Sequence, residues 1–554
     1  MTKEAEAAPP PETGDGAQAR AAFRVGAGIF ASRVSGFVRE AALAYFFGSS
    51  AVADVWRAAL RTPNVLQNLL GEGTLSASFI PVYAEFLEQG REEDAGRFAG
   101  AVLGILVVVS GGLALLGVLV APLLVRLLFF DWEPWMQELA VQIIRIFFPM
   151  TAVLVISAWA VGVLNTHRRF FVSYVAPVFW NLAMVTAMVV FGVGLGLEAV
   201  ERDADLVVLT AWGALTGGAL QLGFQAPWLM KNLRHFRISV SRRVAGVQEA
   251  IRNFIPVVTA RGVVNLSGWI DVVLAAQLAV GAVAVLGYAQ ILYVLPISLF
   301  AMSVAASELP ELSRKREEAR RALAPRVSQA LRRISYFVIP SMLAYLFLGD
   351  VLTAALFQRG DFGEVDSIVV YGVLACYAVG LPASSGSRAL SSAFYAIRDT
   401  KTPARIAYLR VALSVALGIT LMFPLDSVGV GRLRFGAAGL ALGASAAAWL
   451  EYVLLRRRLT KVIGPHGPGG PMVARIFLAG GLASAAGVGV FLALPPVAPG
   501  SDVLASLTGL PVSVVSPPML ALETVLPFGV VYLAAAVGLG LGLPLRSSST
   551  SSNG

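Results

Sequence analysis

The feature that most constrains this chain is a series of long apolar segments that contain no charged residue. Examples are the stretches 98–125, 172–197 and 476–501. An α-helix of about 20 apolar residues crosses a hydrocarbon core of about 30 Å, so each stretch is long enough to span a membrane. The runs are continuous rather than alternating, which is typical of membrane helices and not of a membrane β-barrel. Only 14% of the residues are charged, against roughly 25% in a soluble protein.

Apolar segments bounded by charges, proline or glycine predict about fourteen transmembrane helices. They lie near 22–47, 52–87, 97–128, 139–165, 172–197, 206–230, 250–279, 282–310, 327–349, 367–397, 403–424, 435–455, 472–494 and 520–543. The second is long and is interrupted at Pro63 and at Gly71 and Gly73, which predicts a broken helix. The expected fold class is an all-α polytopic membrane protein.

Basic residues are concentrated in alternate loops of this predicted topology. The richest of these loops are at 231–252, 311–333, 398–405 and 456–461. By the positive-inside rule these loops are cytoplasmic, and an even number of helices places both termini on the same side. The net charge of +9 is explained by these loops, so no nucleic-acid partner is expected.

Two parts of the chain resemble each other after a shift of about 230 positions, which predicts a parallel internal repeat. Gly48 can be aligned with Gly281, and Arg168 with Arg398. Six predicted helices separate the members of each pair, so the two copies have the same orientation. The predicted parts are a disordered cytoplasmic tail (1–21), an amino-terminal six-helix lobe (22–238), a carboxy-terminal six-helix lobe (249–461), two extra helices (470–545) and a disordered tail (546–554).

Charged residues inside three predicted helices are the strongest functional signal. They are Arg33, Arg39 and Glu40 in the first helix, Asp54, Arg57 and Arg61 in the second, and Arg261 and Asp271 in the seventh. A lone charge at the bilayer centre costs about 3 kcal/mol or more, so such residues face a partner or an aqueous cavity. One interpretation is internal pairing of Arg33 with Glu40, Asp54 with Arg57, and Arg261 with Asp271. However, Asp271 lies about 15 Å along the helix from Arg261, too far for direct pairing.

The alternative is a cavity that binds an anion, because the arginines in these helices outnumber the acids. Arginine suits phosphate, since its planar guanidinium binds bidentately and stays protonated. The expected cargo is an anionic amphipathic molecule. Arg57 could instead lie near a helix end and extend to the membrane interface.

The chain offers little for catalysis or metal binding. Its one cysteine, Cys376, lies in an apolar run, and its histidines His167, His235 and His466 form no ligand cluster. There is no G-x-x-x-x-G-K-[ST] motif for a nucleotide. We expect no cofactor, no metal and no enzymatic activity.

Several motifs together resemble the amino-terminal signature of the MurJ/MviN family. They are Ser32-Arg-Val-Ser-Gly-Phe-Val-Arg-Glu40, Arg61-Thr-Pro-Asn64 and Gly71-Glu-Gly-Thr-Leu-Ser-Ala-Ser-Phe-Ile-Pro81, with Phe394-Tyr-Ala-Ile-Arg-Asp-Thr-Lys-Thr-Pro403 as a weaker match. The resemblance implies a flippase for lipid II, the undecaprenyl-pyrophosphate-linked peptidoglycan precursor, in the bacterial inner membrane. It also implies two six-helix lobes around a cationic cavity and a lipid-tail groove formed by the last two helices. Cell-wall synthesis proteins are expected as further partners.

The resemblance assigns substrate binding to Arg33, Arg39, Asp54, Arg61, Asn64 and Glu72, and we add Arg261 as an intramembrane cation. Two departures stand out. Gln67 and Asn68 stand where the family has a basic pair, and Ile291 stands where it has an arginine. Other readings therefore stay open: a different polyprenyl-linked oligosaccharide, a drug as in related antiporters, or a membrane scaffold for cell-wall enzymes. A scaffold would have no need of surplus intramembrane arginines.

Overall fold

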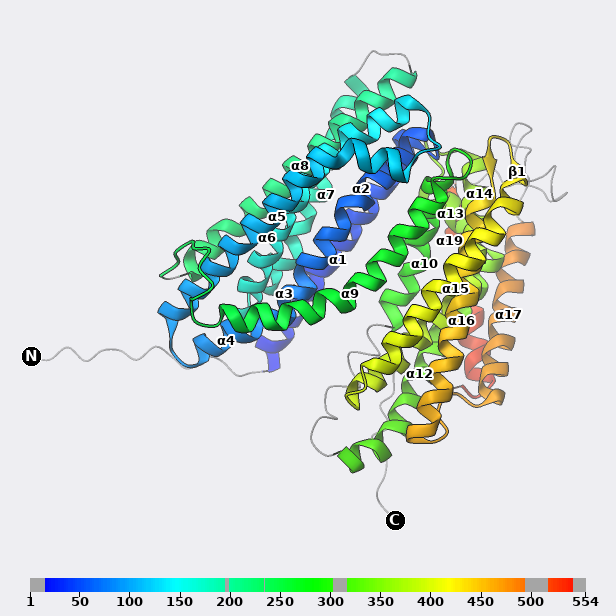
Figure 1. The fold of residues 1–554 in the computed structure, drawn as a ribbon. Helices are drawn as coiled ribbons and strands as arrows, with labels where there is room; N and C mark the ends of the chain where they lie inside the picture. The colour runs from blue at the N-terminus through cyan, green and yellow to red at the C-terminus, as the bar shows by residue number, and fades with distance from the viewer. Residues whose placement is uncertain (1–14, 195–198, 234, 302–315, 494–516, 542–554) are drawn as a thin grey trace, which may run out of the picture. The chain divides into compact units, whose positions relative to one another are not determined.

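A computed structural model describes residues 15–194, 199–233, 235–301, 316–493 and 517–541 (Figure 1). Most of both predicted tails lies outside these ranges. The helices are α1 (Asp15–Phe47), α2 (Ala51–Leu70), α3 (Glu72–Ser78), α4 (Ile80–Glu88), α5 (Glu92–Leu128), α6 (Pro134–Thr166), α7 (Phe170–Gly194), α8 (Ala199–Asn232), α9 (Val247–Ala275), α10 (Ala282–Pro296), the π-helical turn η1 (Ile297–Ala301), α12 (Arg316–Phe347), α13 (Gly349–Phe357), α14 (Glu364–Ala396), α15 (Lys401–Asp426), α16 (Gly436–Ile463), α17 (Gly470–Ala493) and α19 (Pro517–Gly538). Within the described ranges the only strands are β1 (Gly429–Val430) and β2 (Leu433–Arg434), which pair antiparallel.

Ten of the described helices are long and apolar enough to cross a membrane, and the bent pair α12 and α13, which meet at 80°, makes an eleventh. Helices α1, α2 and α9 are not among them; α1 and α2 each have three charged residues close together, at 33, 39 and 40 and at 54, 57 and 61. These three helices coincide with the first, second and seventh predicted spans. The chain is a multi-pass membrane protein and its all-helical fold is confirmed; the total of fourteen spans stays a prediction.

The predicted break in the second span is present at Gly71. Helix α2 ends at Leu70, and α3 begins at Glu72 after an extended Gly71 (φ −86°, ψ −156°). A Cβ on Gly71 would lie 2.3 Å from the carbonyl oxygen of Gln67, so only glycine permits this close approach of the backbone. Pro63 and Gly73 were also expected to interrupt the span, but they lie inside α2 and α3 without ending these helices.

The chain divides into two compact units whose borders run through helices. The first unit comprises residues up to Ala42, Pro63–Ala121 and Gln142–Arg261, and the second comprises Leu43–Thr62, Pro122–Val141 and the chain from Gly262 onward. The first half of α2, with Asp54, Arg57 and Arg61, therefore belongs to the second unit. These units do not coincide with the predicted lobes at 22–238 and 249–461, which stay a prediction.

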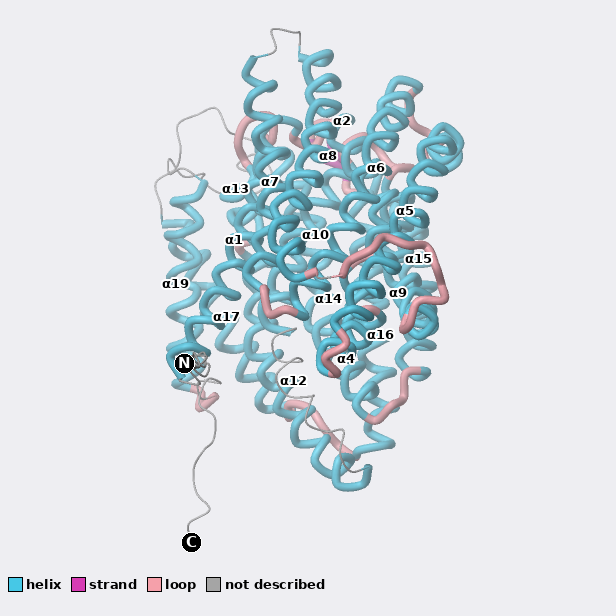
Figure 2. Tube along the Cα trace, turned by 90° about the vertical axis from the view of Figure 1, so that its left-hand side faces the viewer, coloured by secondary structure: helices cyan, strands magenta, loops and turns pink. Residues whose placement is uncertain are grey.

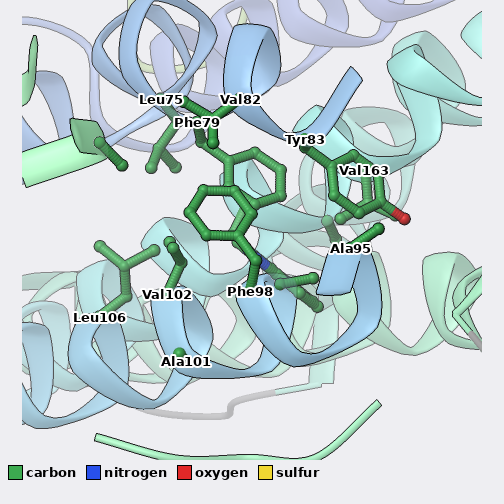
Figure 3. Packing of buried hydrophobic residues seen from close by; sticks show 14 of the residues in the cluster. Leu75, Phe79, Val82, Tyr83, Ala95, Phe98, Ala101, Val102, Leu106 and Val163 are labelled. Carbon is green, nitrogen blue, oxygen red and sulfur yellow. The ribbon is translucent and has the colours of Figure 1, made fainter. Parts of the chain in front are cut away.

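Aromatic packing forms the core of the first unit. Phe79 stacks on Tyr83 and on Phe98 (Figure 3), with ring centroids 5.2 and 5.4 Å apart. The Trp159 ring packs beside Phe79, with ring centroids 6.5 Å apart. Because Phe79 separates α3 from α4, the broken second span is anchored at its second break by this cluster. Elsewhere in this unit α7 packs along α8 (Figure 1).

The second unit is a helical bundle (Figure 2). Within it α15 and α14 both pack on α16, while α17 packs on α12 and α19. The hydroxyl of Tyr532 on α19 donates to the carbonyl oxygen of Tyr336 on α12, inside a buried cluster that includes Phe528. The last two helices are therefore joined to the bundle by specific packing, and the groove expected along 470–545 stays a prediction.

Residues that the internal repeat aligns share an uncommon backbone conformation, a positive φ. Arg168 and Arg398 both have positive φ, at 56° and 61°, which non-glycine residues seldom adopt. The following amides also bond alike: Arg169 N–H donates to Leu164 O at 2.8 Å and Asp399 N–H donates to Phe394 O at 2.9 Å. Gly48 and Gly281, the other aligned pair, also have positive φ. Two helix ends that sequence comparison paired therefore share one local geometry.

Candidate substrate-binding site

Arg39, on α1, is the centre of a polar cluster in the first unit. Its Nη1 donates to Asn181 Oδ1 at 2.9 Å, and its Nη2 lies 2.5 Å from Glu40 Oε1. The guanidinium also lies 5.0 Å from the ring centre of Trp180. Asn181 in turn donates to Ser35 Oγ at 2.9 Å. These contacts fix the guanidinium, and 17% of the Arg39 side chain remains exposed.

The other predicted ligands of the first unit differ in exposure. Arg33, also on α1, is exposed and forms no ion pair among the described residues. Glu40 pairs with Arg39, the residue beside it, whereas helical spacing had suggested Arg33. Asn64 is partly buried on α2, and Glu72 is the first residue of α3, with its side chain outside the description.

Asp54 lies in the first turn of α2 and is only 2% exposed. Its Oδ2 accepts the N–H of Gly281 at 2.6 Å, and its Oδ1 accepts the N–H of Ala284 at 2.7 Å. Both amides belong to the start of α10, where the helix dipole favours a negative charge. A Cβ on Gly281 (φ 95°) would lie 2.7 Å from Ser49 O, so glycine is required for this approach. The carboxylate fastens α2 to α10.

Arg57 and Arg61, on the same helix as Asp54, contact different partners. The guanidinium of Arg57 lies 4.0 Å from the ring centre of Tyr288. Arg61 packs so closely on α9 that a Cβ on Gly268 would lie 2.2 Å from its Nη2, and it lies within electrostatic range of Asp271. Asp271 is therefore a partner of Arg61.

A second polar cluster, in the second unit, gathers residues from four helices. Arg410 Nη1 on α15 lies 2.9 Å from the buried Glu451 Oε2 on α16, and Arg388 on α14 is within electrostatic range of both. Beside them Tyr293 on α10 donates its hydroxyl to Ser384 Oγ at 2.6 Å. Sequence reasoning did not single out Arg388, Arg410 or Glu451. The sequence could have indicated them, because all three are charged residues inside predicted spans.

The residues that depart from the family pattern occupy distinct places. Gln67 and Asn68 line a cavity inside the first unit. Ile291 follows Gln290, whose Nε2 donates to the hydroxyl of Tyr377 at 3.1 Å. Arg261 lies on α9, and its side chain is outside the description.

No metal-ligating group of three His, Cys, Asp or Glu side chains occurs within the described ranges. His167, at the end of α6, instead contacts the hydroxyl of Tyr83 through Nε2 at 3.0 Å. Burial, aided by the charge of Arg169, lowers the pKa of this imidazole. A neutral His167 is therefore the form favoured at neutral pH, and it joins α6 to α4.

The sequence model of the family described as "Lipid II flippase MurJ" matches residues 43–494. The chain belongs to this family. Among curated relatives, "Probable lipid II flippase MurJ" from Rhizobium tropici is 31% identical over 439 residues, covering 78% of this chain and 79% of the relative. "Lipid II flippase MurJ" from Burkholderia cenocepacia is 31% identical over 454 residues, covering 80% and 84%.

Solved structures support the same fold. The structure titled "Lipid II flippase MurJ, inward closed conformation" has a TM-score of 0.72 at 21% identity, covering 93% of this chain and 98% of that one. An inward-facing multidrug resistance transporter of the MATE family has a TM-score of 0.59 at 16% identity, covering 77% and 95%. Membership in MurJ confirms a transporter rather than an enzyme. The family match begins at Leu43 and so does not include Arg33 and Arg39.

Proposed function

We propose that this chain is a flippase that moves lipid II from the inner to the outer leaflet of the bacterial cytoplasmic membrane by alternating access. Membership in the MurJ family and the fold support this proposal. The observation that best supports the proposal is the position of Arg39. Its guanidinium is held in place by Glu40 and Asn181, and its side chain is still partly exposed. A fixed guanidinium on a partly exposed side chain inside a membrane helix suits a phosphate, because its orientation need not be reorganised on binding.

The second unit offers further cations for the headgroup. Arg61, Arg388 and Arg410 share only Asp271 and Glu451 as acids within their described surroundings. A pyrophosphate carries about two negative charges and is best bound by more than one guanidinium.

The polyprenyl tail needs an apolar surface beside the headgroup site. A pocket of about 200 Å³ lies among α12, α14, α16 and α17 of the second unit, lined by apolar residues such as Ile339, Met342 and Phe477, with Arg456 at its edge. Its composition, apolar with one cation, supports a role in holding part of an anionic lipid. The expected tail site along the last two helices is thus retained as part of the proposal.

Both termini and the basic loops face the cytoplasm in this proposal, which rests on the positive-inside rule. An impermeant thiol reagent tests it. Cysteines placed at Arg237 or at Arg457 should remain unlabelled in intact cells and become labelled after lysis, in a Cys376→Ala background. Labelling of either position in intact cells would contradict the orientation.

The cellular test of the function is depletion of a bacterium's own lipid II flippase with this chain as the replacement. Growth and normal lipid II levels in the inner leaflet are expected. Accumulation of lipid II there, with the chain present in the membrane at normal levels, would contradict the function. It would leave another polyprenyl-linked oligosaccharide as the cargo, or a role as a scaffold.

A further inference from the structure

A cavity of about 420 Å³ lies within the first unit, enclosed by α1, α2, α3, α6, α7 and α8. Its volume falls within the range of about 300–1,000 Å³ that is usual for small-molecule sites. The polar side chains that line it are Ser32, Gln67, Asn68, Ser157, Ser173, Tyr174, Trp180 and Gln221. Among the described lining residues none carries a charge. The break at Gly71 forms part of the wall, so the cavity depends on the interrupted second span.

Two lining residues have buried polar atoms without a hydrogen-bond partner in the described structure, Ser173 Oγ and Trp180 Nε1. Ser173 is only 4% exposed. Pro177, one turn further along α7, has no N–H, so the carbonyl oxygen of Ser173 also loses its usual helical donor. Such groups are normally satisfied in a native protein. Their presence at one wall indicates that a ligand or water supplies the missing bonds.

Helices α6 and α8 contribute a polar network to the wall, and this network fixes the orientation of an amide. Ser157 Oγ donates to Gln225 Oε1 at 2.9 Å and accepts from Gln221 Nε2 at 2.8 Å. The Gln225 Nε2 atom behind it has no partner in the described residues. Amide and hydroxyl groups therefore face the space from α2, α6, α7 and α8, with the rings of Tyr174 and Trp180 between them.

This composition selects a class of ligand. A free phosphate would need cations, and none is among the described lining residues, since Arg39 lies over the Trp180 ring instead of lining the cavity. A metal ion would need carboxylates, and the described lining has none. Neutral hydroxyls and amides together with aromatic rings suit a saccharide, which has many hydroxyls and an apolar ring face.

We propose that this cavity binds the sugar that is bonded directly to the pyrophosphate of the lipid cargo. The inference rests on the proposed function and names a subsite for it. The Trp180 ring connects the two parts of the headgroup, because it lines the cavity on one side and carries Arg39 5.0 Å from its centre. Gln67 and Asn68 stand where the family has a basic pair. In this proposal their neutral side-chain amides bind the sugar.

Binding of two lipids to the purified full chain in detergent, followed by native mass spectrometry, tests the subsite. One lipid is a polyprenyl pyrophosphate, and the other is the same lipid with an N-acetylated hexose on the pyrophosphate. The wild-type chain should bind the sugar-bearing lipid at least tenfold more tightly. Gln67→Leu/Asn68→Leu should reduce this ratio to about one while binding of the sugar-free lipid changes less than twofold.

Gln89→Leu, at an exposed glutamine that ends α4, is the control and should keep the wild-type ratio. Ser173→Ala, which removes one hydroxyl with little change of volume, should lower the ratio about threefold and guards against misfolding of the double variant. Equal binding of the two lipids by the wild type would mean that the cavity holds water only and would overturn the subsite. In that case the proposed function stands, whereas failure to bind either lipid would overturn both.

Discussion

Arg39 and Asp54 were both predicted to bind substrate, yet their surroundings differ. Asp54 is enclosed, and both of its oxygens accept backbone amides of α10. Arg39 is held by side chains and is still partly exposed. An intramembrane charge whose bonding capacity is used by the backbone stabilises the fold, whereas one held by side chains at a polar surface is available to a ligand. Charged residues inside predicted membrane helices look alike in the sequence. The comparison divides them into residues that stabilise the fold and residues that bind a ligand.

The largest effect is expected for Asp54→Ala. Two charge-assisted hydrogen bonds are lost and two buried amides are left without an acceptor, which should destabilise the protein by about 3–5 kcal/mol. Thermal unfolding of the detergent-solubilised protein measures the loss. Asp54→Asn should cost less, because its amide retains one acceptor oxygen.

Asp131→Ala, at an exposed acid between α5 and α6, is the control and should leave the unfolding temperature unchanged. An Asp54→Ala protein of wild-type stability that no longer binds lipid would place Asp54 with Arg39 and remove the contrast.

Substitution of Arg39, in contrast to that of Asp54, should weaken ligand binding. Arg39→Ala combined with Glu40→Gln, which removes both charges of the ion pair, should weaken binding of a polyprenyl pyrophosphate about 10- to 100-fold, as expected for loss of a guanidinium–phosphate contact. Arg39→Lys should restore only part of the affinity, since an ammonium cannot bind bidentately. Native mass spectrometry of the full chain measures the affinity.

The matched control is Arg97→Ala, which removes an exposed arginine paired with Glu93 on α5. Wild-type affinity in the Arg39 variant would show that Arg39 is structural after all.

Substitution of Arg261 tests whether this arginine, whose place on α9 is known, binds the ligand as Arg39 is expected to do. Arg261→Ala should lower lipid flipping about tenfold, as for loss of one ion-pair contact to phosphate. Adding Ile291→Arg should restore part of the activity, because it returns an arginine to a position on α10 beside Gln290. Arg252→Ala, in the second turn of the same helix, serves as the control. Unchanged flipping in Arg261→Ala would restrict phosphate binding to the other arginines.

The smallest effect on stability is expected at the two turns that the internal repeat aligns, at 168–169 and 398–399. Asp399 Oδ1 accepts the N–H groups of Lys401 and Thr402 at 3.1 and 3.0 Å, and bonds from Thr402 lower the pKa of this carboxyl. A lowered pKa in the folded state means that the stabilisation is present at neutral pH and is lost as the pH falls through that value. Asp399→Ala should cost about 0.5–1 kcal/mol at pH 7, the usual value of a helix cap, and less in strong acid.

The aligned turn has Arg169 in place of Asp399, so it has no such cap. Arg169→Ala should therefore change stability without this acid dependence. Equal dependence on pH in both variants, measured by thermal unfolding, would contradict the assignment.

Sequence reasoning predicted the features that local chemistry determines. The break at Gly71 follows from residues close in sequence, and the alignment of Arg168 with Arg398 paired two turns whose positive φ values were not predicted. Charge partners were harder, because helical spacing suggested Arg33 for Glu40, while Arg39 is fixed by Asn181, 142 positions away. Arg388 and Arg410 were missed although they lie in predicted spans, and their cluster with Glu451 depends on how α14, α15 and α16 pack.

Flipping of fluorescent lipid II by the purified chain in liposomes tests the central proposal most directly. A reductant that cannot cross the bilayer quenches only the outer-leaflet lipid, so transport between leaflets appears as additional quenching. Wild-type liposomes should show this quenching, and the Arg39→Ala/Glu40→Gln variant, reconstituted in equal amount, should show at least tenfold less. Equal flipping by both proteins, or no flipping by the wild type, would contradict a lipid II flippase that binds its cargo through Arg39.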